Sequence, residues 1–347
     1  MSIEKKDFGF TREGKKISSY TISNAQGGSV TVLDFGAVLK NVYVPDREGK
    51  LTDVVLGYDD LAHYEVNGPC FGATIGRSGN RIAGASFVLD GCEYHLAKNE
   101  NENNLHSGPF GFHFRPWMAE VKEENNAVSF LLDSPDGDQG YPGNFLAKVT
   151  YTLTDDNAVD IHYEGTADAK TVVNMTNHSY WNLNGEGSGS ILDQYLEIEA
   201  DGFTPVNEKL IPIGMIQAVE GTPFDFRHLK TIGQDAAATS VQLEYGNGYD
   251  HNFAVIGTGY RKAAYAVSDK SGITLTVMTD QPGMQFYAGN SIGTEEGKGG
   301  KTYHSNEGFA LETQHFPNSV NTPEFESPVL NANEKYDTRT TYILGLL

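Results

Sequence analysis

The alternation of hydrophobic and polar residues with a period of two is the dominant pattern along this chain. Four segments show it clearly, and each predicts a half-buried β-strand: residues 145–153, 159–163, 196–200 and 273–277. Turn-forming stretches such as SPDGDQGYPG and SDKSG lie between segments of this kind, and the chain contains 39 glycines, enough for many hairpins. The pattern therefore predicts antiparallel sheets.

Helical patterns are few. Only residues 60–64 and 235–245 are helix candidates, so the alternation of strands and helices that builds a parallel sheet is missing. The stretch 202–227 contains proline and glycine and is expected to be a long surface excursion. No internal repeat or low-complexity linker divides the chain. We therefore predict an all-β fold, an antiparallel β-sandwich, formed by a single domain over residues 1–347.

The charge and composition of the chain limit the kinds of partner that the protein can bind. The formal net charge is −21, from 25 Lys and Arg against 46 Asp and Glu, which repels a phosphate backbone and argues against nucleic acid. The N-terminal MSIEKKDFGF lacks the apolar stretch of a secretory signal, and no run reaches the roughly 18 apolar residues of a membrane span. We expect a cytoplasmic protein in which Cys70 and Cys92 are free thiols.

The segment VNMTNHSYWNLNG, residues 173–185, places a histidine among aromatic and amide side chains. If it forms a strand, Thr176, His178 and Tyr180 share one face. Aromatic rings can cover the apolar side of a sugar, while amide and imidazole groups orient its hydroxyls. A lone histidine is more often a satisfied core residue, so the neighbouring stretches decide between the two interpretations.

Glu312 lies in a second informative segment, FALETQHFPNS. Alternation puts Phe309 and Leu311 on one face of a strand and Glu312 on the other. If that second face is also enclosed, burial raises the pKa of the glutamate toward the range of a general base. The competing interpretation is an ordinary solvent-facing glutamate.

Three polar loops supply further candidates. The glycine-rich IGRSGNRIAG contains Asn80 and Arg81, where the backbone can approach a ligand and a guanidinium can donate several hydrogen bonds. NENNLHSGPFGF contains His106, and GYDHNF places Asp250 at the start of a strand. A salt bridge that braces the loop, or simple turn chemistry, would explain the same residues without a ligand.

Six motifs in this order, from residue 76 to residue 319, resemble the aldose 1-epimerases, or galactose mutarotases: GRSGNRI, NLHSG, NHSYWNLNG, DHNF, QPGMQFYAGN and LETQHFPNS. The resemblance implies a large antiparallel β-supersandwich with a sugar-binding groove, which agrees with the period-two pattern. The chain departs from the family pattern in two places. Asn318 stands where aspartate is more usual, and residues 186–246 contain no matching motif.

The resemblance also implies roles. Glu312 is expected to be the general base, His178 the general acid, and His106 a second histidine near the ring oxygen. Asn80, Arg81, Asp250 and Gln285 are expected to bind the sugar hydroxyls. Interconversion of anomers needs an acid and a base acting together and no cofactor. Glu312 must then be ionised while His178 is protonated, and the acidic chain is expected to help keep His178 charged.

Several alternatives remain at this point. Asp250 and Glu312 are a nominal carboxylate pair for a glycosidase. His106, His178, Asp250 and Glu312 are possible metal ligands, although no closely spaced ligand motif is present and no metal is expected. A non-catalytic sugar-binding protein and a hexose-6-phosphate 1-epimerase are the other readings. The expected partner is a free aldose, with the choice between galactose and glucose open, and the protein is expected to be a monomer or a homodimer.

Overall fold

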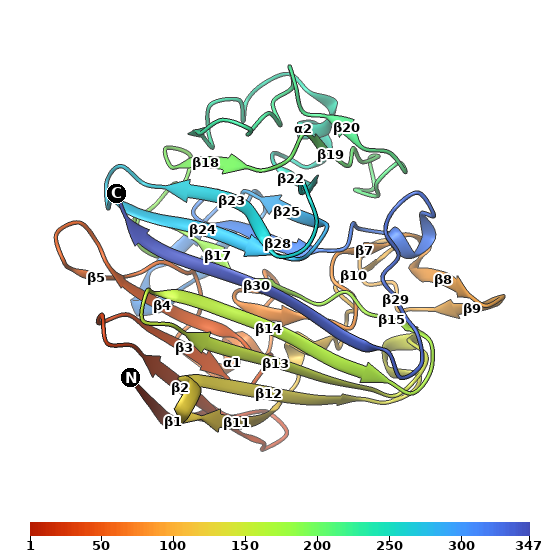
Figure 1. Cartoon of the computed structure of the whole chain (residues 1–347), viewed down its shortest axis with the longest axis horizontal. Helices are drawn as coiled ribbons and strands as arrows, with labels where there is room; N and C mark the ends of the chain where they lie inside the picture. Colours follow the sequence, from red (N-terminus) through yellow and green to blue (C-terminus); the bar gives the residue numbers. More distant parts are fainter.

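The computed structural model describes residues 1–347 as an antiparallel all-β protein (Figure 1). Its largest sheet has nine strands, and the C-terminal strand β30 lies near the middle of it. In spatial order the strands are β11 (Met118–Lys122), β12 (Ala127–Ser134), β13 (Phe145–Leu153), β14 (Ala158–Ala167), β30 (Lys335–Leu346), β24 (Ile273–Thr279), β23 (Arg261–Val267), β18 (Tyr195–Ile198) and β21 (Lys230–Thr231).

Two further sheets lie on the large one. The first has five strands in sequence order: β1 (Ser2–Phe10), β2 (Lys16–Ser23), β3 (Ser29–Leu33), β4 (Leu39–Pro45) and β5 (Leu51–Asp53). The second has six strands in the spatial order β17 (Tyr180–Trp181), β28 (Phe309–Gln314), β25 (Gly283–Tyr287), β22 (Asp250–Ala254), β19 (Gly202–Phe203) and β20 (Gln217–Ala218).

Short elements complete the fold. Five two-stranded ladders pair β6 (Ala73–Ile75) with β16 (Thr176–His178), β7 (Arg81–Ile82) with β10 (Asn104–Leu105), β8 (Ser86–Leu89) with β9 (Cys92–His95), β15 (Thr171–Val172) with β29 (Val329–Leu330), and β26 (Thr294–Glu296) with β27 (Thr302–His304). The α-helices are α1 (Leu61–Tyr64) and α2 (Val241–Tyr245). No helix of the structure has both the length and the apolar character needed to cross a membrane.

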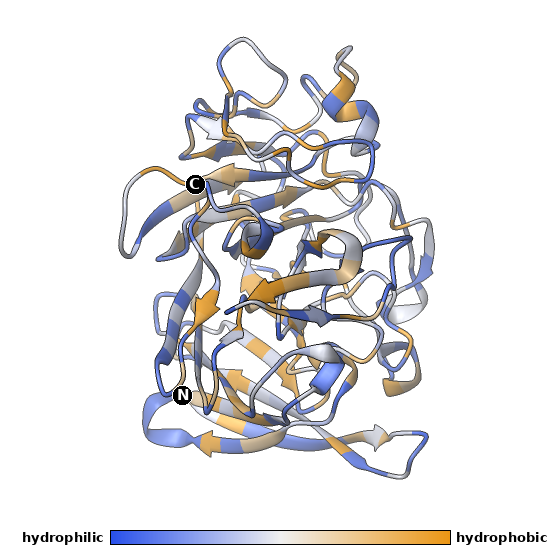
Figure 2. Ribbon diagram, turned by 90° about the vertical axis from the view of Figure 1, so that its right-hand side faces the viewer, coloured by the Kyte–Doolittle hydropathy of each residue, from blue (hydrophilic) through white to orange (hydrophobic).

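One continuous core joins the three large sheets. A cluster of 56 buried side chains includes Val32 of β3, Val149 of β13 and Leu311 of β28. Strand β13 shows how the sequence produces this core, since alternate residues along it are buried and the intervening ones are more exposed. Figure 2 shows the same alternation of hydrophobic and hydrophilic bands along the strands. The predicted antiparallel β-sandwich is therefore confirmed.

The four predicted strands are all present, but two other expectations need correction. The second predicted helix, residues 235–245, is helical only over Val241–Tyr245. The stretch 202–227 is not simply a surface excursion, because β19 and β20 fall within it and Phe203, Phe224 and Phe226 are buried in the core. Three aromatic side chains on one polar-looking stretch were the signal for burial.

The segment 173–185 also differs from the predicted single strand. It divides at Ser179 into β16, which pairs with β6, and β17, which pairs with β28. The N–H of Ser179 donates to the side-chain oxygen of Asn177 instead of to a neighbouring strand. The division lets one segment connect a small ladder to the six-stranded sheet.

Arg77 fastens the glycine-rich loop to the large sheet. Arg77 is 1% exposed, and it is buried without an ion-pair partner. It donates hydrogen bonds to the carbonyls of Ser134, Pro142 and Gly143 and to the hydroxyls of Ser134 and Thr171. Arg77 is thus fully engaged within the protein, and it is not available to bind a phosphate.

We predict that Arg77→Met destabilises the protein. The substitution preserves most of the volume but leaves several buried carbonyls without a donor, which costs at least about 2 kcal/mol. Urea unfolding should show a lower midpoint, whereas Arg12→Met, at an exposed arginine, should leave the midpoint in place. An unchanged midpoint for Arg77→Met would show that water replaces these hydrogen bonds without cost.

Candidate active site

The six-stranded sheet has one apolar and one polar face. Leu311 and Phe286 point into the core from the apolar face. The antiparallel register places Glu312 directly beside Gln285, and Gln285 beside Asn252. Because alternate residues point to opposite faces, these polar side chains gather on the face away from the core. The local alternation of the sequence therefore builds the floor of a polar site.

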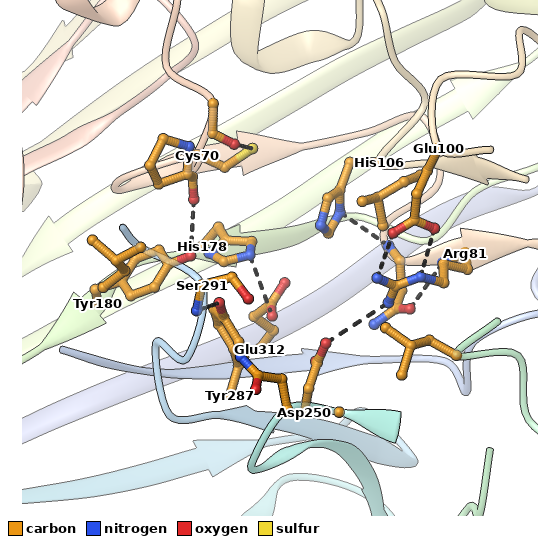
Figure 3. A pocket seen from close by; sticks show the side chains of 18 of the residues that line it. Cys70, Arg81, Glu100, His106, His178, Tyr180, Asp250, Tyr287, Ser291 and Glu312 are labelled. Carbon is orange, nitrogen blue, oxygen red and sulfur yellow. Dashed lines mark hydrogen bonds and ion pairs between the residues drawn. The ribbon is translucent and has the colours of Figure 1, made fainter. Parts of the chain in front are cut away.

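Glu312 and His178 meet above this floor (Figure 3). The Nε2 of His178 lies 3.5 Å from the Oε1 of Glu312, and the two residues are 6% and 2% exposed. The imidazole stacks on the ring of Tyr180, with centroids 5.0 Å apart. The Oε2 of Glu312 is buried and has no hydrogen-bond partner in the protein. A carboxylate and an imidazole from distant parts of the chain thus face each other across one small space.

Burial governs the charge of this pair. It raises the pKa of Glu312 well above its ordinary value; Asp250 adds to the shift and Arg81 opposes it. Burial also lowers the pKa of His178. The expectation that the acidic chain keeps His178 charged is therefore wrong, because loss of water around the imidazole outweighs the remote negative charge. Both shifts act in the same sense, because burial favours the form in which both groups are neutral, a protonated carboxyl beside an uncharged imidazole.

His106 approaches the same space from the loop after β10. Its backbone N–H donates to the carbonyl of Asn80 at 3.0 Å, and the backbone N–H of Asn80 donates to its Nδ1 at 3.1 Å. An Nδ1 that accepts cannot carry the proton, so the neutral ring carries it on Nε2. Burial, with smaller contributions from nearby histidines and Arg81, lowers the pKa of His106 and keeps the ring neutral. His106 is thus held as a hydrogen-bond donor.

Three of these side chains are close enough to raise the question of a metal ion. Ligand-type atoms of His106, His178 and Glu312 lie within 4.8 Å of one another. A histidine that binds a metal usually donates its other N–H to an acceptor. Here the Nδ1 of His106 is itself an acceptor, and the Nδ1 of His178 has no partner. The surroundings of the two rings fit proton transfer rather than metal binding.

Arg81 and Asp250 face each other on the other side of the cavity. The Nη1 of Arg81 lies 4.0 Å from the Oδ2 of Asp250, too far for a direct hydrogen bond. The carboxylate of Glu100 accepts hydrogen bonds from the Nε and Nη2 of the same guanidinium, at 2.7 and 2.6 Å. Burial works to lower the pKa of Arg81, but Asp250 and Glu100 outweigh it and the net shift is upward. Arg81 is therefore charged. The salt bridge to Glu100 braces the loop, as one of the two interpretations of the sequence expected, and binding of a sugar by Arg81 stays a prediction.

The structure brings six of the seven predicted site residues to one cavity of about 480 Å³: Asn80, Arg81, His106, His178, Asp250 and Glu312. The seventh, Gln285, lies behind the wall. Its Nε2 donates to Asp250 at 2.6 Å, and its Oε1 accepts from Gln314 at 3.3 Å. Gln285 contacts Asp250 instead of the open space, so direct hydroxyl binding by this residue stays a prediction.

Other residues of the cavity were missed by sequence reasoning. Tyr287 lines it two residues beyond Gln285, on the same face of β25, so the period-two pattern of this strand was a usable signal. Glu100 lies in a loop and Glu295 in the short strand β26, and no pattern marked either of them. Leu210 and Tyr245, from the stretch without a matching motif, form part of the wall. The stretch 186–246 therefore contributes to the shape of the cavity.

The unusual Asn318 does not line the cavity. Its backbone N–H donates to the carbonyl of Arg81 at 2.8 Å, and its side-chain oxygen accepts from the N–H of Ala83. Asn318 has a φ of +59°, a conformation that asparagine tolerates well. The residue braces the strand that holds Arg81 and leaves the chemistry untouched.

The fold and the comparisons with known proteins define the class of protein, an isomerase that acts on aldoses and has an antiparallel β-sandwich fold. The sequence profile described as aldose 1-epimerase matches residues 18–343. The chain therefore belongs to the aldose 1-epimerase family. The resemblance drawn from six motifs is confirmed, and the match extends through the stretch 186–246 that those motifs left uncovered.

Individual relatives agree with this assignment. Galactose mutarotase from Bos taurus is 44% identical to this chain over 315 residues, which is 90% of each sequence. Aldose 1-epimerase from Escherichia coli (strain K12) is 39% identical over 334 residues, 95% of this chain and 96% of that protein. The crystal structure of an aldose epimerase homologue from C. elegans has a TM-score of 0.87 and 32% identity, covering 94% of this chain and 98% of that one.

We predict that Glu312→Gln stabilises the folded protein and that the gain grows with pH. In the unfolded chain Glu312 ionises near its ordinary pKa of 4.5, whereas in the folded chain its pKa is raised. Above pH 4.5 the folded state binds the extra proton, so the wild type loses stability as pH rises toward the folded pKa. The glutamine side chain of the variant does not ionise, so the variant does not lose stability in this way as pH rises.

Thermal unfolding at pH 5 and pH 8 measures this effect. The melting temperature of Glu312→Gln should exceed that of the wild type by a few degrees at pH 8 and by less at pH 5. Glu13→Gln, at an exposed glutamate, should behave as the wild type at both values. A lower melting temperature for Glu312→Gln at pH 8 would contradict the burial argument.

Proposed function

We propose that this protein interconverts the α and β anomers of free aldohexoses such as galactose and glucose. The observation that carries the proposal is the buried pair of Glu312 and His178, 3.5 Å apart in a cavity that also contains hydroxyl-binding groups. Membership of the aldose 1-epimerase family supports it. Proton transfer by two positioned side chains typically accelerates a reaction about 10² to 10⁴-fold.

The reaction needs only protons that the pair can move. Glu312, as the carboxylate, takes the proton of the C1 hydroxyl, while His178, as the imidazolium, gives a proton to the ring oxygen. The C1–O5 bond breaks and an open-chain aldehyde forms. Rotation about the C1–C2 bond presents the other face of the carbonyl. To close the ring, O5 attacks C1 while His178 takes back the proton of the O5 hydroxyl and Glu312 gives its proton to the carbonyl oxygen. His106 donates a hydrogen bond from Nε2 near the ring oxygen.

The protonation state of the Glu312–His178 pair links burial to catalysis. Ring opening converts an ionised pair into a neutral one, because Glu312 ends protonated and His178 ends neutral. This neutral form is the one that burial favours in the structure. The neutral resting pair must therefore first ionise, by transfer of the Glu312 proton to His178, and ring opening returns the pair to the form that burial favours.

The charges of the cavity favour a free sugar over a sugar phosphate. Arg81 is the only Lys or Arg side chain that lines it, and four carboxylates, Glu100, Asp250, Glu295 and Glu312, line it as well. Arg77, the other arginine near the motifs, is buried outside the cavity. A phosphate dianion would meet repulsion that a neutral hexose does not. Arg81, Asp250 and Asn80 are suited to bind hydroxyls.

The localisation, the number of domains and the oligomeric state are proposals of the same kind. We infer a cytoplasmic protein, an inference that both cysteines support because Cys70 and Cys92 are unpaired. Burial also raises the pKa of Cys70 to about 12, so this thiol at the cavity wall is held in its unreactive form. A single domain over residues 1–347, and a monomer or a homodimer, stay predictions.

Glu312→Gln is expected to abolish turnover while sugar still binds, because the amide keeps the shape of the site but cannot accept the proton. Polarimetry of freshly dissolved α-D-galactose should show at least about a 100-fold loss of the enzymatic rate. Calorimetric titration with galactose should still detect binding. Full activity in this variant would place the base elsewhere, and binding without any wild-type catalysis would identify a sugar-binding protein.

Glucose 6-phosphate is expected to be a poor substrate relative to glucose. Repulsion from the carboxylates should lower kcat/KM by about tenfold or more, and the difference should shrink at high salt, which screens charges. Polarimetric rates for both sugars at low and high ionic strength measure this. Equal kcat/KM values at low salt would favour a hexose-6-phosphate 1-epimerase.

A further inference from the structure

Glu100 is a cavity residue that no motif of the sequence marked. It lies in the loop between β9 and β10, and its carboxylate accepts two hydrogen bonds from one edge of the Arg81 guanidinium, at 2.7 and 2.6 Å. Its side chain is 25% exposed, and that of Arg81 is 9% exposed. This fork is the shortest and most directional contact that Arg81 makes, so it fixes the plane of the guanidinium.

The orientation that results leaves one nitrogen for a ligand. With Nε and Nη2 engaged by Glu100, the Nη1 of Arg81 faces the Oδ2 of Asp250 across 4.0 Å. Figure 3 shows Arg81 between these two carboxylates. A sugar hydroxyl placed near this gap can accept from Nη1 and donate to Asp250 at the same time. Gln285 holds Asp250 from behind at 2.6 Å.

Glu100 also balances charge. Arg81 lowers the pKa of Glu312, opposing the effect of burial. A carboxylate at hydrogen-bond distance offsets much of the field of the guanidinium on its surroundings. Without the Glu100 charge, the Glu312 carboxylate would feel Arg81 more strongly and would bind its proton less tightly.

We propose that Glu100 is a positioning residue of this enzyme: it holds Arg81 so that Nη1 and Asp250 together bind a sugar hydroxyl. Glu100 acts through Arg81, and it neither transfers a proton nor needs to touch the sugar. The proposal rests on the proposed function for the identity of the ligand. Its geometric core, the coupling of Glu100 to Arg81, is tested independently below.

A double-mutant cycle tests this coupling. The variants are Glu100→Gln, Arg81→Gln and the two combined, with kcat and KM for α-D-galactose measured by polarimetry. Glu100→Gln alone should lower kcat/KM about tenfold, mainly through KM, because the charge-assisted fork is lost. In the Arg81→Gln background the same change should alter kcat/KM less than twofold. Glu100→Asp, which keeps the charge, should recover part of the loss.

Two further measurements separate positioning from a merely structural role. Both limbs of the kcat/KM profile should move to lower pH in Glu100→Gln, because the uncompensated charge of Arg81 disfavours an added proton on His178 and on Glu312 alike. Glu102→Gln is the matched control. This glutamate lies in the same loop, forms an ion pair with Lys209, has a side chain that is 65% exposed and does not line the cavity. It should leave kcat/KM and the pH profile unchanged.

The proposal fails if Glu100→Gln costs the same factor with and without Arg81, or if it costs nothing. It also fails if Glu102→Gln has an equal effect, because the loop as a whole would then be responsible. If the wild type does not accelerate mutarotation, the proposed function fails instead. The cycle on calorimetric Kd values for galactose then still tests Glu100, with non-additivity supporting the proposal and additivity overturning it.

Discussion

Glu312 and His178 face each other inside the fold, and an isolated charge on either would be unstable there. Burial favours the form of the pair in which both groups are neutral, and this is the constraint on which the rest of the site depends. It requires a cavity that excludes most water, a rigid floor that fixes the carboxylate, and a second element that brings the imidazole from another part of the chain. The antiparallel sandwich meets each requirement with a different sheet or ladder.

Rigidity comes from the core. Strand β28 buries Phe309 and Leu311 in the cluster of 56 side chains, so Glu312, the next residue along the strand, has little freedom to move toward water. His178 is held by the β16 ladder and by stacking on Tyr180. The loops contribute polar groups held in place, since Asn80 and His106 are joined by one backbone hydrogen bond and by a second from the Asn80 N–H to the Nδ1 of His106. Burial of the Glu312 carboxyl lowers the stability of the fold, and burial of the apolar face of the same strand offsets this loss.

The sequence predicted the parts of this arrangement that follow from local periodicity. Alternation identified the strands and placed Glu312 opposite Leu311, and ordered motifs placed His178 and Arg81 in one site. It did not predict the division at Ser179 or the charge state of His178, because burial depends on which distant segments pack around a residue. The net charge of the chain therefore did not predict the charge of His178. Glu100 had no local signal at all, since its role exists only once Arg81 lies beside it.

Neutron diffraction from ligand-free crystals at neutral pH would test the central claim most directly, because it locates the protons on both members of the pair. The account predicts a protonated Glu312 carboxyl beside an uncharged His178 imidazole that carries a single N–H proton. It also predicts that His106 carries its proton on Nε2. A bare carboxylate beside a neutral His178, or a doubly protonated pair, would contradict the account.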